Sequence, residues 1–366
     1  MTLAVGRRVV VPRFEESPLD ALEGMTIEAQ PAPDPKTLAA HDVIIAVKSA
    51  SVGWVDLLMS SGQYQHMPQP PYCPGLEYAG VVAYTGPEAT GILVGDSVLV
   101  DGFLAGPRSL GAYQSYGGFA SWAVAPCEAV RRVPGELTLD QACNLLGNYE
   151  TAYHCLITRG RLQPKETVLI HGASGSTGLA AVHVAKLAGA TVIATGRNDD
   201  KLAIVKSQGA DHVINTKTSS NPKGWAHDCK ALTGGAGVDV IYDGVGGDIS
   251  IESLRCVKFG ARFLIVGWAA TPFVAKGKGE RGAPNANTLP TNLIMMKGLD
   301  VLGCPTVIST VMNPASRAPR LDAVWAWAEQ GKIVPYISHA YPLEDYRVAM
   351  RAKWNNEVIG GCVLHP

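Results

Sequence analysis

The feature that most constrains the fold of this chain is a glycine-rich segment in residues 166–186, ETVLIHGASGSTGLAAVHVAK. An apolar run before the glycines predicts a strand, and the apolar spacing after them predicts a helix. Glycines allow a tight turn and a close approach of the backbone to a ligand, and a helix N-terminus presents N–H groups to a pyrophosphate. The segment therefore predicts a dinucleotide-binding loop; the alternative is a tight turn without a ligand. The expected cofactor-binding residues are Gly172, Ala173, Ser174, Gly175, Ser176, Thr177 and Gly178.

Strand-like and helix-like segments alternate after this loop. Short apolar runs separated by segments of helical spacing are typical of βαβ units, and these units form parallel sheets covered by helices. We therefore predict an α/β fold with a doubly wound Rossmann sheet in residues 144–315. The expected elements are a helix over 250–260 and strands over 190–196, 212–216, 238–247, 261–267 and 299–304.

The chain upstream of this region has a different pattern. Between residues 7 and 134, short β-rich segments are separated by Gly and Pro turns, which predicts a mostly β domain. The C-terminal tail ends in the strand-like run 358–364, and we expect it to return to the first domain. The predicted substrate domain is therefore discontinuous and consists of residues 1–143 and 316–366.

Charge and cysteine usage exclude several classes of partner and site. The formal net charge is −1, and no long run of either sign occurs, so we expect neither nucleic acid nor a membrane surface as partner. The N-terminus lacks the apolar core of a secretory signal and no apolar run reaches bilayer-spanning length, so we expect a cytoplasmic protein. The eight cysteines are scattered without a CxxC pair, which indicates free thiols.

The choice of cofactor depends on the end of the strand that follows the glycine loop. NAD-binding enzymes carry an acidic residue there for the ribose diol. This chain has Gly196 at that position, then Arg197 and, four residues on, Lys201. Cations suit a 2′-phosphate, so we predict NADPH as the cofactor. Because Asp199 and Asp200 lie nearby, the alternative is that these cations are solvated surface residues.

The sequence resembles the medium-chain dehydrogenase/reductase superfamily, and within it the zinc-free quinone oxidoreductase (zeta-crystallin-like) branch. The matching motifs span nearly the whole chain: SVGWVDLLMSSGQY, PGLEYAG, VGDSVLV, GGFASWAVAP, TAYHCL, the glycine loop, GADHVIN, VDVIYDGVGG and YPLEDYRVAM. The resemblance implies that the first domain is GroES-like and that residues 144–315 bind NADP(H). It also implies a homodimer joined through edge strands, for which the apolar segment 299–310 is suited.

The resemblance further implies that the chain holds no metal. Zinc-dependent alcohol dehydrogenases of this superfamily bind catalytic zinc through Cys, His and Cys. The corresponding residues here are Gly53, Leu76 and Gly147, and none of them can bind a metal. The segment 101–118, which corresponds to the structural zinc lobe, contains no cysteine. We therefore expect a zinc-independent enzyme.

The cofactor side of the site is also implied by the resemblance. Thr151, a candidate catalytic residue, and Tyr149 are expected beside the nicotinamide. Thr216 replaces the tyrosine that the family places near the 2′-phosphate, so cofactor preference rests more on Arg197 and Lys201. The residues expected to border the nicotinamide from the ends of later strands are Val245, Gly246, Val266, Gly267 and Trp268.

The substrate side departs from the pattern of the branch, which usually carries Asn and Tyr where this chain has Gly53 and Leu58. Tyr64 is a candidate catalytic proton donor, with a packing tyrosine as the alternative. Asp56 and Glu77 are expected to be structural, as are His154 and His171. The predicted substrate pocket comprises Gly53, Trp54, Leu58 and Tyr149, with Tyr113 and Tyr116 as further candidates.

Without a metal to polarise a simple carbonyl, such a site suits acceptors activated by conjugation. We predict an NADPH-dependent oxidoreductase that reduces a quinone or an α,β-unsaturated carbonyl compound. An alternative is an enoyl-CoA reductase in which Lys276, Lys278 and Arg281 bind the phosphates, unless the loop 271–292 that carries them is simply solvated. A third hypothesis, from another class, is an NADPH-binding structural or sensory protein without turnover.

Overall fold

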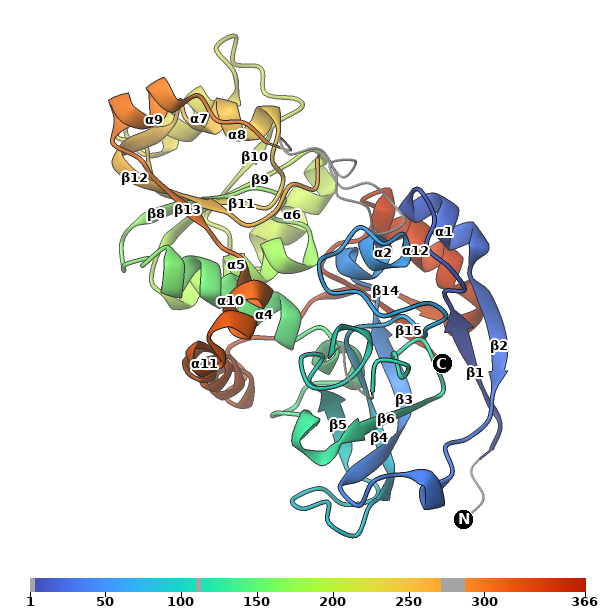
Figure 1. Ribbon diagram of the computed structural model, residues 1–366. Coiled ribbons are helices and arrows are strands. Elements are labelled where there is room, and N and C mark those ends of the chain that lie inside the picture. Colours follow the sequence, from blue (N-terminus) through green and yellow to red (C-terminus); the bar gives the residue numbers. More distant parts are fainter. Residues whose placement is uncertain (1–3, 110–112, 271–286) are drawn as a thin grey trace. The chain divides into compact units, whose positions relative to one another are not determined.

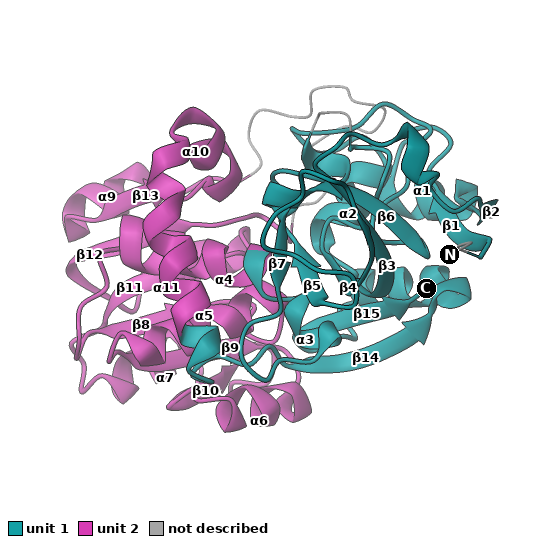
Figure 2. Ribbon diagram, turned by 90° about the horizontal axis from the view of Figure 1, so that it is seen from below, with its two compact units in different colours: residues 1–146, 275–282, 327–366 teal, residues 147–274, 283–326 magenta. Residues whose placement is uncertain are grey.

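The computed structural model describes residues 4–109, 113–270 and 287–366. These residues form two compact units (Figure 2): unit 1 comprises 4–109, 113–146 and 327–366, and unit 2 comprises 147–270 and 287–326. The second boundary lies inside helix α11 (Ala318–Glu329). Within the described residues, no helix is long and apolar enough to cross a bilayer.

Unit 2 is a Rossmann fold, which confirms the predicted fold class. Its six strands all pair in parallel in the order β10-β9-β8-β11-β12-β13, the strand order of a doubly wound dinucleotide-binding sheet. These strands are β8 (Thr167–Ile170), β9 (Thr191–Gly196), β10 (His212–Asn215), β11 (Val238–Asp243), β12 (Val257–Ile265) and β13 (Asp300–Gly303).

Helices cover both faces of this sheet (Figure 1). One apolar cluster joins the strands to the helices that follow β10, β11 and β12, whereas α5 packs on β8 and β9. The helices of the unit are α4 (Leu146–Tyr153), continued by a π-helical turn (His154–Arg159), α5 (Ser176–Leu187), α6 (Asp199–Ser207), α7 (Trp225–Leu232), α8 (Asp248–Ser253), α9 (Thr291–Lys297), α10 (Thr306–Met312) and α11.

The helix predicted over 250–260 is wrong in its second half. Helix α8 ends at Ser253, and β12 already begins at Val257, which pairs with Val238 of β11. A register shift follows this first pair, and Gly260 has a φ of +76°. The glycine therefore lies within an irregular strand, where its positive φ is allowed, and does not end a helix.

Unit 1 is mostly β, as predicted, and its tail does return to it. The sheet order is β14-β15-β3-β4-β5-β7, with β6 also paired to β3 and a separate hairpin of β1 and β2. The strands are β1 (Gly6–Val10), β2 (Thr26–Gln30), β3 (Asp42–Ser51), β4 (Tyr78–Thr85), β5 (Ser97–Val100), β6 (Trp122–Pro126), β7 (Val130–Arg132), β14 (Ile337–Pro342) and β15 (Gly361–His365). The helices are α1 (Pro18–Gly24), α2 (Trp54–Ser60), α3 (Leu139–Ala142) and α12 (Tyr346–Trp354).

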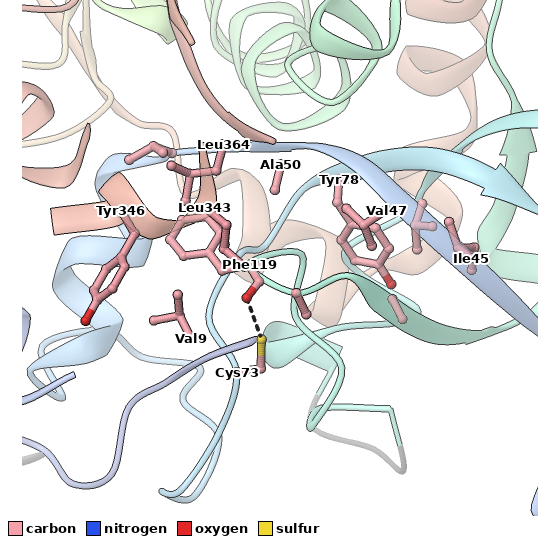
Figure 3. Close-up of a cluster of buried hydrophobic side chains, with 14 of the residues drawn as sticks. Val9, Ile45, Val47, Ala50, Cys73, Tyr78, Phe119, Leu343, Tyr346 and Leu364 are labelled. Atoms are coloured by element: carbon pink, nitrogen blue, oxygen red, sulfur yellow. Dashed lines mark hydrogen bonds between the residues drawn. The ribbon is translucent and has the colours of Figure 1, made fainter. Parts of the chain in front are cut away.

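The core of unit 1 joins segments from both ends of the chain (Figure 3). Val9, Tyr78 and Phe119 from the first half pack in one cluster with Leu343 and Tyr346 from the tail. The Tyr346 hydroxyl donates to the carbonyl of Met25 at 2.9 Å. The tail is thus an integral part of this unit, because its apolar side chains complete the core.

Candidate functional site

The glycine loop of unit 2 has a backbone shape that only glycine allows. Gly172 follows β8 with a φ of +63°, a left-handed conformation that side chains disfavour. A Cβ on Gly178 would lie 2.3 Å from the carbonyl oxygen of Gly172. Gly175 is the N-cap of α5 and provides no side-chain cap. The first-turn N–H groups of α5 therefore face a close-packed turn without side chains in the way, which fits a dinucleotide pyrophosphate.

A buried histidine supports this loop from below. His171 Nδ1 lies 2.8 Å from Thr195 Oγ1 in β9, and Nε2 lies 2.6 Å from Ser253 Oγ at the end of α8. Burial lowers the pKa of His171 to about 4, although the charge of Asp243 acts in the opposite direction. The ring is therefore neutral at pH 7 and joins three segments of the unit, which is the structural role expected for it.

The residues predicted to border the nicotinamide lie after β11 and β12, at the same carboxyl edge of the sheet as the glycine loop (Figure 1). Asp243 orders them, because its Oδ1 accepts from the N–H groups of Val245 (2.9 Å) and Gly246 (3.0 Å). Val245 also faces the loop, since a Cβ on Gly172 would lie 3.1 Å from its Cγ2. The N–H groups of Val266 and Gly267 donate to the Asp243 carbonyl, and the Trp268 side chain is half exposed.

Helix α4 presents Tyr149 and Thr151 and is tied to the glycine loop and its helix. The Tyr149 hydroxyl lies 2.8 Å from His183 Nδ1 of α5, and Thr177 Oγ1 donates to Asn148 Oδ1 at 3.2 Å. Tyr149 is buried and Thr151 is half buried. Helix α4 is thus connected to the predicted loop through Asn148 and to α5 through Tyr149.

A buried ion cluster anchors the same helix and was not predicted. The Glu150 carboxylate accepts from Arg317 (Nη2 2.6 Å, Nε 2.9 Å) and from Arg320 Nε (2.9 Å). Arg320 also donates to Thr310 of α10. Glu150 and Arg320 are 1% exposed. Sequence reasoning missed the cluster because its members are about 170 residues apart and follow no motif.

At the end of β9, the predicted cofactor-selecting residues lie together. Arg197 is exposed and directly precedes Asn198, whose side chain caps α6 by accepting from the Lys201 N–H at 2.9 Å. The Asp199 carboxylate accepts from Asn215 Nδ2 at 2.8 Å. Of the two acidic residues near these cations, Asp199 is therefore engaged with a side chain of β10.

In unit 1, Asp56 organises the region that corresponds to the zinc site of relatives. Its Oδ2 accepts from the Gly53 N–H at 2.9 Å, and its Oδ1 accepts from the N–H groups of Gly75 (3.1 Å) and Leu76 (3.0 Å). Burial raises the pKa of Asp56 to about 6, while these hydrogen bonds and the charge of Arg108 lower it. Asp56 is structural, as expected, because all three partners are backbone groups.

The other predicted substrate residues surround α2. Trp54 begins this helix and stacks on Trp354 of α12 with ring centroids 5.3 Å apart, and Leu58 on α2 is half buried. The Tyr64 hydroxyl is hydrogen-bonded to Arg108, and burial raises the pKa of Tyr64, so the phenol is protonated at neutral pH. Sequence reasoning did not single out Arg108.

Three further residues remain: Tyr113 and Tyr116, the additional candidates for the substrate pocket, and His154, which was expected to be structural. The Tyr113 hydroxyl donates to Asp42 Oδ1 at 2.5 Å, which engages it at the start of β3, and Tyr116 is half buried against the unit 1 core. Both ring nitrogens of His154 are buried without a hydrogen-bond partner among the described residues, and burial lowers its pKa to about 4. The basic cluster Lys276, Lys278 and Arg281 lies outside the described residues.

The chemistry of the donor set offers little to a metal. Gly53 and Leu76 have no ligand atom in their side chains. Across the ranges that the structure describes, no three His, Cys, Asp or Glu side chains gather closely enough to hold a metal ion. All eight cysteines are free.

Comparisons with known proteins agree with this architecture. Residues 39–135 match the alcohol dehydrogenase GroES-like domain family, and residues 176–318 match the zinc-binding dehydrogenase family. The chain is 31% identical over 333 residues to quinone oxidoreductase-like protein 2 homolog of Nematostella vectensis, covering 90% of this chain and 83% of that protein.

Two further relatives differ in how much they share. A highly-reducing polyketide synthase of Aureobasidium melanogenum is 35% identical over 240 residues, which are 64% of this chain and 10% of the synthase. The crystal structure of a probable oxidoreductase from Mycobacterium abscessus superposes with a TM-score of 0.79 at 27% identity and covers 99% of both chains.

Proposed function

The chain belongs to the quinone oxidoreductase-like branch of the medium-chain dehydrogenase/reductase superfamily, and from this premise we propose that it transfers hydride from NADPH to a conjugated acceptor. Membership makes it an oxidoreductase that uses a nicotinamide cofactor. The acceptor class that we propose is a quinone or an α,β-unsaturated carbonyl compound. The observation that carries the proposal is the glycine loop, whose backbone excludes a side chain at Gly178 and presents the N-terminus of α5.

NADPH rather than NADH is favoured by the charges after β9. Arg197 is exposed, and the carboxylate of Asp199 is already hydrogen-bonded to Asn215. A 2′-phosphate would therefore meet the cations of Arg197 and Lys201, and a guanidinium matches the geometry of phosphate oxygens well. Bound NADPH would supply the hydride.

The chain's own residues would bind the cofactor, orient the nicotinamide and supply a proton to the acceptor. Thr151 and Tyr149 on α4 are the candidates for holding the nicotinamide edge, because α4 is tied to the glycine loop and to α5. Tyr64 is the candidate proton donor, since its phenol is protonated at neutral pH. We propose that no zinc takes part, because Gly53, Leu76 and Gly147 offer no ligand atom.

A second candidate function is reduction of an enoyl thioester at the same site. It is favoured by the 35% identity over 240 residues to part of a protein named a highly-reducing polyketide synthase. Free coenzyme A would inhibit an enoyl-CoA reductase and would not affect an enzyme that reduces free quinones or enones.

We also propose that two copies of the chain pair through β13. This strand is an edge of the unit 2 sheet as far as the structure describes it, because its one pairing there is with β12. Apolar side chains on the neighbouring helices are exposed, namely Met295 and Met296 of α9 and Val311 and Met312 of α10. An unpaired edge with exposed apolar flanks suits a two-fold interface, and sedimentation of the purified chain would show a dimer.

The test is NADPH consumption by purified, EDTA-treated protein with a panel of quinones, enones and enoyl-CoA thioesters, and with NADH in parallel. We expect turnover of at least one free acceptor, NADPH preferred, and no change after EDTA treatment. Activity only after zinc is added would overturn the mechanism. Tight NADPH binding without turnover of any acceptor would instead support a structural or sensory protein.

A further inference from the structure

Arg108 lies beside Leu76, one of the positions that correspond to zinc ligands in zinc-dependent members of the superfamily. It belongs to a short 3-10 helix (Pro107–Ser109), and its Nε lies 3.4 Å from the carbonyl of Gly102. A Cβ on Gly102 would be 3.1 Å from Arg108 Nη2 and 2.6 Å from the Leu76 carbonyl oxygen. The guanidinium therefore lies close to Leu76, which corresponds to one zinc ligand. Its charge also lowers the pKa of Asp56, whose carboxylate accepts from the N–H of Gly53, a residue that corresponds to another zinc ligand.

The guanidinium has few polar partners among the residues that the structure describes. It lies over the Phe103 ring at 4.5 Å from the centroid, and its polar partners among the described residues are the Gly102 carbonyl and the Tyr64 hydroxyl. Within that part of the chain it forms no ion pair with a carboxylate. A guanidinium has five N–H donors, so donors remain for an anionic or carbonyl oxygen.

Neighbouring polar groups are arranged around the same cation. Arg108 donates to the Tyr64 oxygen, which leaves the phenolic O–H as a donor. His66 contacts the Tyr64 ring edge-on, with centroids 6.3 Å apart. Its Nε2 is buried without a hydrogen-bond partner in the described residues, and burial together with the charge of Arg108 lowers the pKa of His66. Arg108, Tyr64 and His66 therefore place the charge of a guanidinium near a ring nitrogen that has no hydrogen-bond partner in the described residues.

We propose that Arg108 and Tyr64 bind the carbonyl oxygen of the acceptor and that the guanidinium stabilises the negative charge which this oxygen gains. This inference rests on the proposed function. In the reaction, hydride brings its electron pair to the β-carbon of the acceptor and forms a C–H bond there. The C=C π pair forms the new double bond between the α-carbon and the carbonyl carbon, and the C=O π pair moves to the oxygen, which takes the charge. Tyr64 then gives its phenolic proton to this oxygen, water exchanges that O–H proton for a proton at the α-carbon, and the Tyr64 phenolate regains a proton from water. A fixed cation at a developing oxyanion takes over the polarising role that zinc has in relatives.

The experiment uses p-nitrophenol as a non-reacting probe of the oxyanion site, with the protein saturated with NADP⁺. Its anion absorbs in the visible and resembles a planar enolate. We expect the wild-type chain to bind the anion in preference to the neutral phenol, and Arg108→Met to lose that preference. In steady-state assays, Arg108→Met should lower kcat by about 100-fold, the effect of losing one oxyanion donor, with the Kd for NADPH unchanged.

Two further variants complete the test. Arg108→Lys keeps the charge without the planar donor pair and should retain part of the anion preference, which covers the case that Arg108→Met fails to fold. Arg132→Met is the matched control, since that arginine pairs with Asp96 at 2.9 Å on the surface of the same unit, and it should behave like wild type. Unchanged anion preference and kcat in folded Arg108→Met would overturn the inference and leave the proposed function standing. A wild-type chain that turns over no acceptor but binds p-nitrophenolate through Arg108 would overturn the proposed function alone.

Discussion

The glycine loop of unit 2 and the Arg108 region of unit 1 are both candidate binding sites, but different parts of the chain fix their shapes. The loop is held by backbone: Gly178 touches Gly172, and α5 starts where the turn ends. The Arg108 region is held by side chains of segments far apart in sequence, with Asp56 binding the backbone at Gly53 and Leu76. A backbone-built site tolerates few residue types, whereas a side-chain-built site can change its chemistry by single substitutions. This contrast fits a family that keeps one cofactor fold and varies its acceptors.

The largest predicted effect is a loss of stability in unit 2. We expect it when the buried carboxylate of Glu150, which anchors helix α4 beside the glycine loop, is replaced. Glu150→Gln removes the carboxylate charge that faces the buried Arg320 and the partly buried Arg317, and the charge of Arg320 then has no opposite charge beside it at 1% exposure. Breaking a buried ion pair in this way costs about 3–5 kcal/mol of unfolding free energy. Urea denaturation followed by circular dichroism measures the loss.

The matched control lies on the surface of unit 1. Glu28 pairs with Arg8 at 3.6 Å and is about half exposed, so Glu28→Gln should change the unfolding free energy by less than about 1 kcal/mol. Equal losses of unfolding free energy in the two variants would mean that the Glu150 ion pairs stabilise the chain no more than a surface ion pair does, which would contradict the prediction.

The second prediction concerns pH. The pKa of His171 is about 4 in the folded chain and 6.5 as the ordinary value, so between these values the unfolded chain binds a proton that the folded chain does not. Titration of His171 therefore leaves the free energy of unfolding unchanged above pH 6.5 and lowers it as the pH falls from 6.5 toward 4. The difference corresponds to roughly 3 kcal/mol.

Urea denaturation between pH 7 and pH 4.5 tests this linkage in wild type and in His171→Gln. The variant should lose less stability over this range than wild type does. His227→Gln, which changes an exposed histidine of α7, should keep the wild-type slope. Parallel slopes in wild type and His171→Gln would assign the acid sensitivity to other groups.

The third prediction sharpens the claim that backbone shapes the cofactor site. Gly178→Ala places a methyl group 2.3 Å from the Gly172 carbonyl oxygen, so the loop must open before the cofactor can bind. We expect the Kd for NADPH, measured by its fluorescence, to rise about 100-fold, or about 2.7 kcal/mol. Gly303→Ala, at the end of β13, is the control, because no described atom lies within 4 Å of its Cβ; a similar loss in both variants would contradict the steric explanation.

How far the sequence predicts each site follows from the same contrast. The glycine loop and the carboxyl edge around Val245 could be predicted, because their residues follow strands in a regular pattern. Arg108 and the partners of Glu150 could not, because no periodicity links a side chain to a partner in another segment, such as Tyr64 for Arg108 or Arg320 for Glu150. The boundary between α8 and β12 was misplaced because an apolar run with a glycine is compatible with both elements.

The smallest predicted effect concerns the rim of the cofactor site. There we expect an exposed side chain, and not the shape of the backbone, to determine which cofactor binds. Arg197→Gln removes a cation that we expect to contact the 2′-phosphate, so the Kd for NADPH should rise about tenfold, or about 1.4 kcal/mol, while the Kd for NADH stays the same. Lys206→Gln, in the last turn of α6, the helix that follows Arg197, is the control for general loss of positive charge and should change neither Kd. If Arg197→Gln weakened NADH and NADPH equally, the residue would support the loop and not select the cofactor, and the selectivity would have to come from Lys201.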